Sequence, residues 1–160
     1  GPIEKVSSLG TKRLNKLEAE DTLVSIGKLK NGGLFTIEVT TAARPKDFEA
    51  SLSVVGEKGL IEIGGIGLNK LEKCEFINNK INFSNLKKKY SEKIDNGYGK
   101  SHIKLINGII YNLQNNILNS PVPIETTIKT CDFVNAIYKS DEQKKWINTK
   151  DKLVSKRLGV

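Results

Sequence analysis

The hydrophobic residues of this 160-residue chain change their period near residue 84. Before that point apolar side chains alternate with polar ones, as in strands that have one covered face. After it they recur every three or four residues, as in amphipathic helices. A chain that places strands first and helices afterwards is typical of an α+β fold.

A tight hairpin is the clearest local signal in the first half. Residues 22–29 and 34–41 both alternate, and Asn31-Gly32 between them can supply the positive φ angles of a tight turn. The apolar residues of the second strand share one face: Phe35, Ile37 and Val39. Its polar residues share the other face: Thr36, Glu38 and Thr40. We therefore expect a sheet with one packed face and one polar face.

Two further hairpins are expected before residue 84. Their strands are residues 48–55 with 60–63, and residues 71–77 with 80–83. Gly56 and Gly59 bound the first turn, and Asn78-Asn79 separates the second pair. Residues 86–96 are polar and lysine-rich, so we expect a mobile loop there.

The second half predicts two helices. Isoleucine and leucine recur at helical spacing between residues 102 and 118, with Ser101 as the expected N-cap. Two prolines in residues 120–123 end that helix. A second helix is expected at about residues 126–139, burying one stripe: Ile128, Cys131, Val134 and Tyr138.

These elements predict one open, mainly antiparallel sheet with two helices packed on one face. The apolar sheet face and the two helical stripes would cover one another. The other sheet face would remain open. A chain of 160 residues has the size of one domain with one core.

Composition and charge exclude several classes of protein. A formal net charge of +8 raises nucleic acid as a partner, but the basic residues are scattered, apart from clusters at residues 87–89, 144–145 and 150–157. We therefore expect no nucleic-acid binding. Residues 103–118 are too short and too polar to span a membrane. No secretion signal pattern is present, so we expect a cytoplasmic protein.

Most catalytic and cofactor motifs are missing. No G-x-G-x-x-G follows a strand, and the glycines of residues 64–67 have neither that spacing nor a helix after them. A single histidine, His102, excludes any site that needs two imidazoles. Cys74 and Cys131 form no C-x-x-C pair, and we expect two reduced, partly buried thiols. The sequence thus predicts no catalytic residue, cofactor site or metal site in this chain.

Three stretches resemble one family, that of glucose–fructose oxidoreductase, inositol dehydrogenase and the rhizopine-catabolism dehydrogenases (Gfo/Idh/MocA). The first is Gly1-Pro2-Ile3-Glu4-Lys5-Val6. The second runs from Glu20-Asp21-Thr22 through Thr41-Ala42-Ala43-Arg44-Pro45 to Val55-Gly56-Glu57-Lys58-Gly59. The third is Gly97-Tyr98-Gly99-Lys100-Ser101-His102, followed by Pro121-Val122-Pro123-Ile124 and Ala136-Ile137-Tyr138-Lys139-Ser140.

The resemblance implies that residues 1–160 are the C-terminal substrate-binding and oligomerisation domain of an NAD(P)-dependent oxidoreductase. In the family a Rossmann domain, which would precede Gly1, binds NAD or NADP and carries the catalytic lysine and Asp/His pair. The isolated chain is therefore expected to be inactive. The second and third stretches look most like dehydrogenases of nucleotide-activated sugar acids such as UDP-N-acetylglucosaminuronate. The family's open sheet face joins subunits, which implies a homo-oligomer.

Four residues are candidates for substrate binding. Arg44 could offer a bidentate fork to a carboxylate or phosphate, although it could equally be a solvated surface residue. Tyr98 could stack on a sugar or simply anchor its glycine-flanked turn. His102 and Lys100 lie at the start of a helix, where an anionic or hydroxylated ligand is favoured, but they could also be ordinary exposed residues. We expect Arg44, Tyr98 and His102 to line one pocket. Trp146 is expected in the core or in a subunit contact rather than against a ligand.

Two alternatives stay open at this point. The chain could be a stand-alone carbohydrate-binding or scaffold module without catalysis, or a basic sheet that binds nucleic acid. The reading frame ahead of Gly1 discriminates between the enzyme and the module. A G-x-G-x-x-G and a Glu-Lys-Pro motif there would support the enzyme, and their absence would favour the module.

Overall fold

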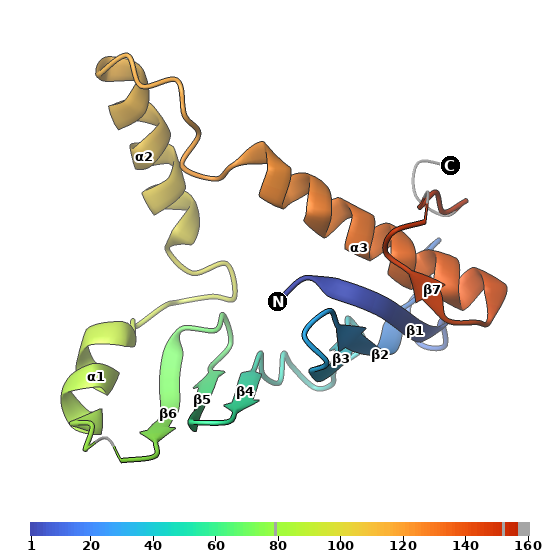
Figure 1. The fold of residues 1–160 in the computed structure, drawn as a ribbon, viewed down its shortest axis with the longest axis horizontal. Helices are drawn as coiled ribbons and strands as arrows, with labels where there is room; N and C mark the ends of the chain where they lie inside the picture. Colours follow the sequence, from blue (N-terminus) through green and yellow to red (C-terminus); the bar gives the residue numbers. More distant parts are fainter. Residues whose placement is uncertain (79, 152, 157–160) are drawn as a thin grey trace. The chain divides into compact units, whose positions relative to one another are not determined.

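The structure is a computed structural model that describes residues 1–78, 80–151 and 153–156. The chain divides into two compact units (Figure 1). Unit 1 comprises Gly1–Ala43 and Val122–Val160, and unit 2 comprises Arg44–Pro121. Asn79 of the expected second turn, and Lys152 and Arg157 of the basic segment, lie outside the described residues.

Unit 1 is a four-stranded antiparallel sheet with one helix. The strand order is β3 (Leu34–Thr40), β2 (Thr22–Leu29), β1 (Ile3–Thr11) and β7 (Ile147–Asn148). Helix α3 (Ile124–Gln143) lies against β1 and β7 (Figure 1).

The predicted β2–β3 hairpin is confirmed. Gly32 takes a φ of 91° in the turn, and Gly27 pairs with Phe35 across the two strands. A Cβ on Gly27 would lie 2.1 Å from Phe35 Cζ, so the ring occupies the space that the glycine leaves open. The edge of the same ring meets Phe133 of α3, with ring centroids 5.8 Å apart. This glycine therefore allows an aromatic contact between sheet and helix.

The core of unit 1 lies between the sheet and α3. Its buried apolar residues are Val6, Leu23, Ala136, Ile137 and Ile147. Each fully buried valine, leucine or isoleucine contributes about 1.5–3 kcal/mol by leaving water.

A buried polar seam completes this contact. Beyond the short pairing with β7, the edge of β1 meets α3 side chains instead of a strand. The backbone N–H of Ser8 donates to Ser140 Oγ (3.0 Å), and that of Gly10 donates to Asp141 Oδ1 (3.0 Å). Tyr138 donates its hydroxyl hydrogen to Glu20 Oε1 at 2.8 Å. The bonds from Ser8 and Gly10 satisfy edge N–H groups of β1 that would otherwise be left without partners.

The expected buried stripe of α3 is wrong. The buried residues are Ala136, Ile137, Ser140 and Asp141. Ile128 is 52% exposed, Cys131 is exposed and Val134 is 36% exposed, while Tyr138 is half-buried. The face of α3 that packs against β1 carries small side chains and the acceptors Ser140 and Asp141. Small side chains let the helix approach the strand closely, and the acceptors pair with N–H groups on the edge of β1.

The open face of the unit 1 sheet agrees with the predicted alternation. Thr36, Glu38 and Thr40 are exposed on β3. Their neighbours across the ladder include Val24 and Ile26, which remain 44% and 47% exposed. The exposed face of this sheet therefore has apolar residues on β2 and polar residues on the neighbouring strand β3. At the far end of α3, Trp146 is 47% exposed, with Lys5 Nζ 5.1 Å from the ring centroid.

Unit 2 contains a three-stranded antiparallel sheet in the order β4 (Leu52–Gly56), β5 (Gly59–Gly64) and β6 (Lys70–Phe76). Helix α1 (Phe83–Tyr90) packs against β6 (Figure 1). The predicted β4–β5 hairpin is confirmed, but β4 begins at Leu52, so residues 48–51 are not part of the expected strand.

A helix stands where the sequence predicted a strand and a mobile loop. Strand β6 pairs with β5 and not with residues 80–83, and α1 covers residues 86–90 of the loop expected at 86–96. Asn82 caps the helix by accepting from the N–H of Asn85 (3.1 Å), and Lys87 ion-pairs with Glu72 of β6 (2.9 Å). The cap and this tertiary contact stabilise a short helix that has few apolar residues.

Helix α2 (Ser101–Gln114) forms in the predicted region, but it ends at Gln114 rather than near residue 118, before the prolines that were expected to end it. Its N-cap is Lys100, and Ser101 is the first helical residue. Segment 115–121 returns along the helix (Figure 1). Pro121 packs close to Gly108, where a Cβ would lie 3.2 Å from Pro121 Cγ. Asn112 Nδ2 donates to the carbonyl of Asn119 at 2.7 Å. The predicted apolar stripe remains exposed rather than buried: Ile106, Ile109, Ile110, Leu113 and Ile117.

The α+β class is confirmed, with open antiparallel sheets. The strands form two sheets rather than the expected one, and there are three helices among the described residues rather than two. Of the two thiols, Cys74 is half-buried and Cys131 is exposed, so the expectation of partial burial is wrong for Cys131. Among the described helices, none combines the length and apolar character needed to cross a membrane.

Candidate functional site

The predicted site residues at the start of α2 are presented by one organised turn. Asn96 accepts the N–H of Tyr98 on its side-chain oxygen (3.0 Å) and the N–H of Gly99 on its carbonyl (3.2 Å). Gly99 has a φ of 61°, a conformation that favours glycine. The turn leads from Asn96 directly into the helix, which places Tyr98, Lys100 and His102 on one short stretch.

Tyr98 and His102 are in contact. Their ring centroids are 6.4 Å apart, with the planes inclined at 64°. Both side chains are exposed, Tyr98 by 80%. An aromatic ring and an imidazole that are both accessible could stack on a sugar ring and hydrogen-bond its hydroxyls.

The turn between β5 and β6 packs closely against residues 94–97. A Cβ on Gly67 would lie 2.8 Å from Ile94 Cδ1 and 3.0 Å from the carbonyl oxygen of Gly97, so a side chain there would force its neighbours to shift. Asn69 and Glu92 join the same two segments through two bonds: Glu92 N–H to the Asn69 carbonyl (2.8 Å), and Asn69 Nδ2 to the Glu92 carbonyl (2.7 Å). These contacts hold the β5–β6 turn against residues 92–97, just before the start of α2.

A cavity of about 300 Å³ lies beside these contacts. We call it the lysine cavity, because Lys89 from the end of α1 and Lys100 and Lys104 from the start of α2 all line it. Glu92 is the only carboxylate among its lining residues, and Ser101 adds a hydroxyl. Three lysines against one carboxylate leave an excess of two positive charges.

The single carboxylate is already paired. Lys104 Nζ hydrogen-bonds Glu92 Oε1, and this bond, with the charges of Lys104 and Lys100, holds the pKa of Glu92 below its usual value. Lys89 Nζ lies 5.1 Å from the centroid of its neighbour's ring, Tyr90. Across the described ranges, no carboxylate lies within ion-pair distance of Lys89 or Lys100.

Arg44 lies in the segment between β3 and β4. It follows β3, precedes Pro45 through a cis peptide bond, and makes interactions of its own. It is not among the residues that line the lysine cavity. The structure thus brings Tyr98 and His102 together with Lys100 close by, while the shared pocket with Arg44 stays a prediction.

Sequence reasoning missed Lys89, Lys104 and Glu92. The four-residue spacing of Lys100 and Lys104 on a helix was a usable signal, because such residues share a face. Lys89 gave no such signal, because its position depends on a helix that the sequence did not predict.

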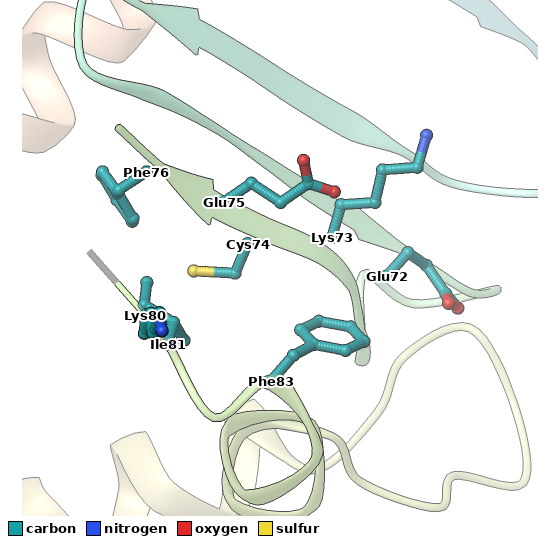
Figure 2. A pocket seen from close by; sticks show the side chains of 8 residues that line it. All are labelled: Glu72, Lys73, Cys74, Glu75, Phe76, Lys80, Ile81 and Phe83. Carbon is teal, nitrogen blue, oxygen red and sulfur yellow. The ribbon is translucent and has the colours of Figure 1, made fainter. Parts of the chain in front are cut away.

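Other cavities also lie on the described part of unit 2. One, of about 770 Å³, shares Asn69 and Glu92 with the lysine cavity and contains the Glu72–Lys87 ion pair, whose hydrogen bond lowers the pKa of Glu72. Another, of about 510 Å³, lies between β6 and the segment before α1, where Cys74 projects toward Ile81 (Figure 2). The thiol has no imidazole among the residues lining this cavity to serve as its base. Within the described part of the chain, no group of three or more His, Cys, Asp or Glu side chains could hold a metal ion.

Comparisons with known proteins agree with this fold. A family model described as the C-terminal alpha/beta domain of an oxidoreductase family, GFO_IDH_MocA_C, matches residues 1–149. No curated protein sequence matches the chain.

Several solved structures share the fold. WlbA dehydrogenase from Chromobacterium violaceum, solved with NADH and UDP-GlcNAcA, is 24% identical with a TM-score of 0.78, over 92% of this chain and 40% of its own. The Bordetella pertussis WlbA dehydrogenase, solved with the same two ligands, is 22% identical with a TM-score of 0.73, over 92% and 39%. A levoglucosan dehydrogenase, solved with NADH and levoglucosan, is 14% identical with a TM-score of 0.66, over 92% and 45%. The chain spans less than half the length of each relative.

Proposed function

The chain belongs to the Gfo/Idh/MocA oxidoreductase family as a C-terminal α/β domain, and on that basis we propose that it is the substrate-contact and subunit-contact part of an NAD-linked sugar oxidoreductase. The observation that carries this proposal is the family match over residues 1–149. In the proposal, hydride transfer belongs to a nucleotide-binding domain of the parent protein. This chain has no glycine-rich dinucleotide turn of its own.

The proposed substrate is a nucleotide-linked sugar acid. Two relatives of similar fold were solved with NADH and UDP-GlcNAcA, and another was solved with NADH and a sugar derivative. The accessible Tyr98–His102 pair and the cationic Lys100 suit a ligand that carries hydroxyls and negative charge. Arg44 is proposed to bind the substrate carboxylate.

The proposed subunit contact is the open sheet face of unit 1. Its centre is apolar at Val24 and Ile26, and its border is polar at Thr36, Glu38 and Thr40. An apolar centre with a polar rim is the usual anatomy of a protein interface. This surface would join copies of the chain into a homo-oligomer.

The test uses the full product of the gene. We expect it to reduce NAD⁺ with UDP-N-acetylglucosaminuronate, followed by NADH absorbance, and to turn over neutral sugars such as levoglucosan more slowly. Calorimetric titration of the isolated chain with NAD⁺ and NADH should show no binding. Micromolar binding to the isolated chain would contradict the assignment of the cofactor to another domain. A parent protein without a dinucleotide-binding motif ahead of Gly1 would leave the stand-alone module as the function.

A further inference from the structure

The lysine cavity carries more positive charge than its own contacts neutralise. Of its three lysines, only Lys104 is ion-paired, to Glu92. Lys89 and Lys100 come from two different helices and line the same cavity without a carboxylate partner in the described part of the chain. Two like charges that line one small cavity repel each other, and an anion bound between them would relieve that repulsion.

The backbone around the cavity is constrained, although the side chains of Lys89 and Lys100 are exposed to solvent. Gly67 cannot carry a side chain without striking Ile94 and Gly97, and Asn69 bridges the strand turn to Glu92. The ion pair of Lys104 with Glu92 ties the start of α2 to the same segment. Lys89 and Lys100 therefore extend from anchored backbone.

From this arrangement we propose that the lysine cavity binds a phosphate or diphosphate group. A phosphate carries about two negative charges near neutral pH, which matches the two unpaired lysines better than a carboxylate with one. Lysine is a common phosphate ligand, acting as a point charge. The volume of about 300 Å³ is at the small end of ligand pockets, which span about 300–1,000 Å³. Ser101 supplies a hydroxyl at the same place.

Two sources could supply this group: free phosphate, or the diphosphate of a nucleotide-linked sugar. The assignment to a nucleotide-linked substrate rests on the proposed function, whereas the binding of the phosphate group does not. The two can therefore be tested separately. Failure of sugar turnover in the parent protein would leave the cavity proposal intact, and failure of phosphate binding would leave the oxidoreductase proposal intact.

The experiment is calorimetric titration of this chain at low salt with pyrophosphate, inorganic phosphate, UDP and glucuronate. We expect pyrophosphate and UDP to bind, and glucuronate to bind at least tenfold more weakly. Raising the salt should weaken pyrophosphate binding, because the contacts are electrostatic. Inorganic phosphate that binds as tightly as UDP would overturn the assignment to a nucleotide-linked substrate.

Substitutions of single lysines distinguish binding in the lysine cavity from nonspecific binding to positive charge on the surface. Lys89→Gln and Lys100→Gln should each weaken pyrophosphate binding by about three- to tenfold, a range set by charge-assisted contacts that are partly exposed to solvent. Lys88→Gln is the matched control, because Lys88 is the exposed neighbour of Lys89 on α1 and does not line the cavity. It should leave binding unchanged, and Lys100→Arg should retain most of it. Absence of pyrophosphate binding, or an equal loss in Lys88→Gln, would overturn the proposal.

Discussion

Ser140 Oγ accepts the backbone N–H of Ser8 at 3.0 Å and donates to the carbonyl of Lys145 at 2.7 Å. The two serines are 132 residues apart, and both are buried. One hydroxyl therefore satisfies an edge donor of β1 and a carbonyl just beyond α3. This contact helps to bring the first strand and the last helix of unit 1 into register.

Ser140→Ala should destabilise unit 1 by about 1–3 kcal/mol, because the buried N–H of Ser8 would lose its acceptor. Denaturant unfolding measures this. Thr127→Ala on the exposed part of the same helix is the control, and it should change the free energy of unfolding by less than about 0.5 kcal/mol. Equal effects of the two variants would show that the seam contributes nothing specific.

Gly27→Ala should destabilise unit 1 by about 1–3 kcal/mol through overpacking. The new Cβ would lie 2.1 Å from Phe35 Cζ and 2.8 Å from the carbonyl oxygen of Lys5, and the backbone contact cannot be relieved by a side-chain rotation. Gly56→Ala is the control, because its nearest neighbour would be 3.8 Å away. Thermal unfolding should separate the two variants, and a tolerated Gly27→Ala would contradict the close packing.

Asp21 should make the stability of unit 1 depend on pH in the acid range. Backbone N–H groups of Asn15, Leu14 and Arg13 donate to its carboxylate at 2.7–3.0 Å, and they lower its pKa from 3.8 to about 2. Because the folded pKa is lowered, the stabilisation is complete above about pH 4 and is lost as the pH falls through about 2. In unfolding curves between pH 2 and 4, Asp21→Asn should have a flatter dependence than the native chain. If the slope is the same in Asp21→Asn, Asp21 is not the source of the pH dependence of stability.

Self-association should depend on the open sheet face of unit 1. Sedimentation of the isolated chain at several concentrations should show a dimer or larger species, and Ile26→Lys should shift it to monomer, because a charge would enter the apolar centre. Val55→Lys changes an 83% exposed valine of unit 2 and should leave association unchanged. A chain that stays monomeric at high concentration would count against this interface.

Arg44→Ala in the parent enzyme should raise KM for an anionic sugar far more than it lowers kcat. The reason is that Arg44 is proposed to bind ground state and transition state alike. Lys46→Ala nearby is the control for surface charge. His102→Ala should leave the free energy of unfolding nearly unchanged, because the side chain is exposed. An unchanged KM in Arg44→Ala would show that Arg44 does not bind the substrate.

Local patterns in the sequence were enough for the α+β class and for much of the secondary structure. The hairpin of β2 and β3 follows from alternation and an Asn-Gly turn, and the face that carries Thr36, Glu38 and Thr40 follows from the two-residue period. The start of α2 was placed to within one residue by helical spacing. These features depend on neighbours a few residues away, which the sequence contains directly.

The remaining features depend on contacts between distant residues. Helix α1 relies on an ion pair with β6 that no local pattern reveals, and with it Lys89 joins Lys100 in one cavity. The buried face of α3 was mispredicted because hydrophobic spacing favours Ile128 and Val134, whereas β1 needs acceptors for the N–H groups of Ser8 and Gly10. Hydrogen-bond satisfaction at a buried strand edge outweighed apolar burial on that helix, and this balance exists only once strand and helix have met.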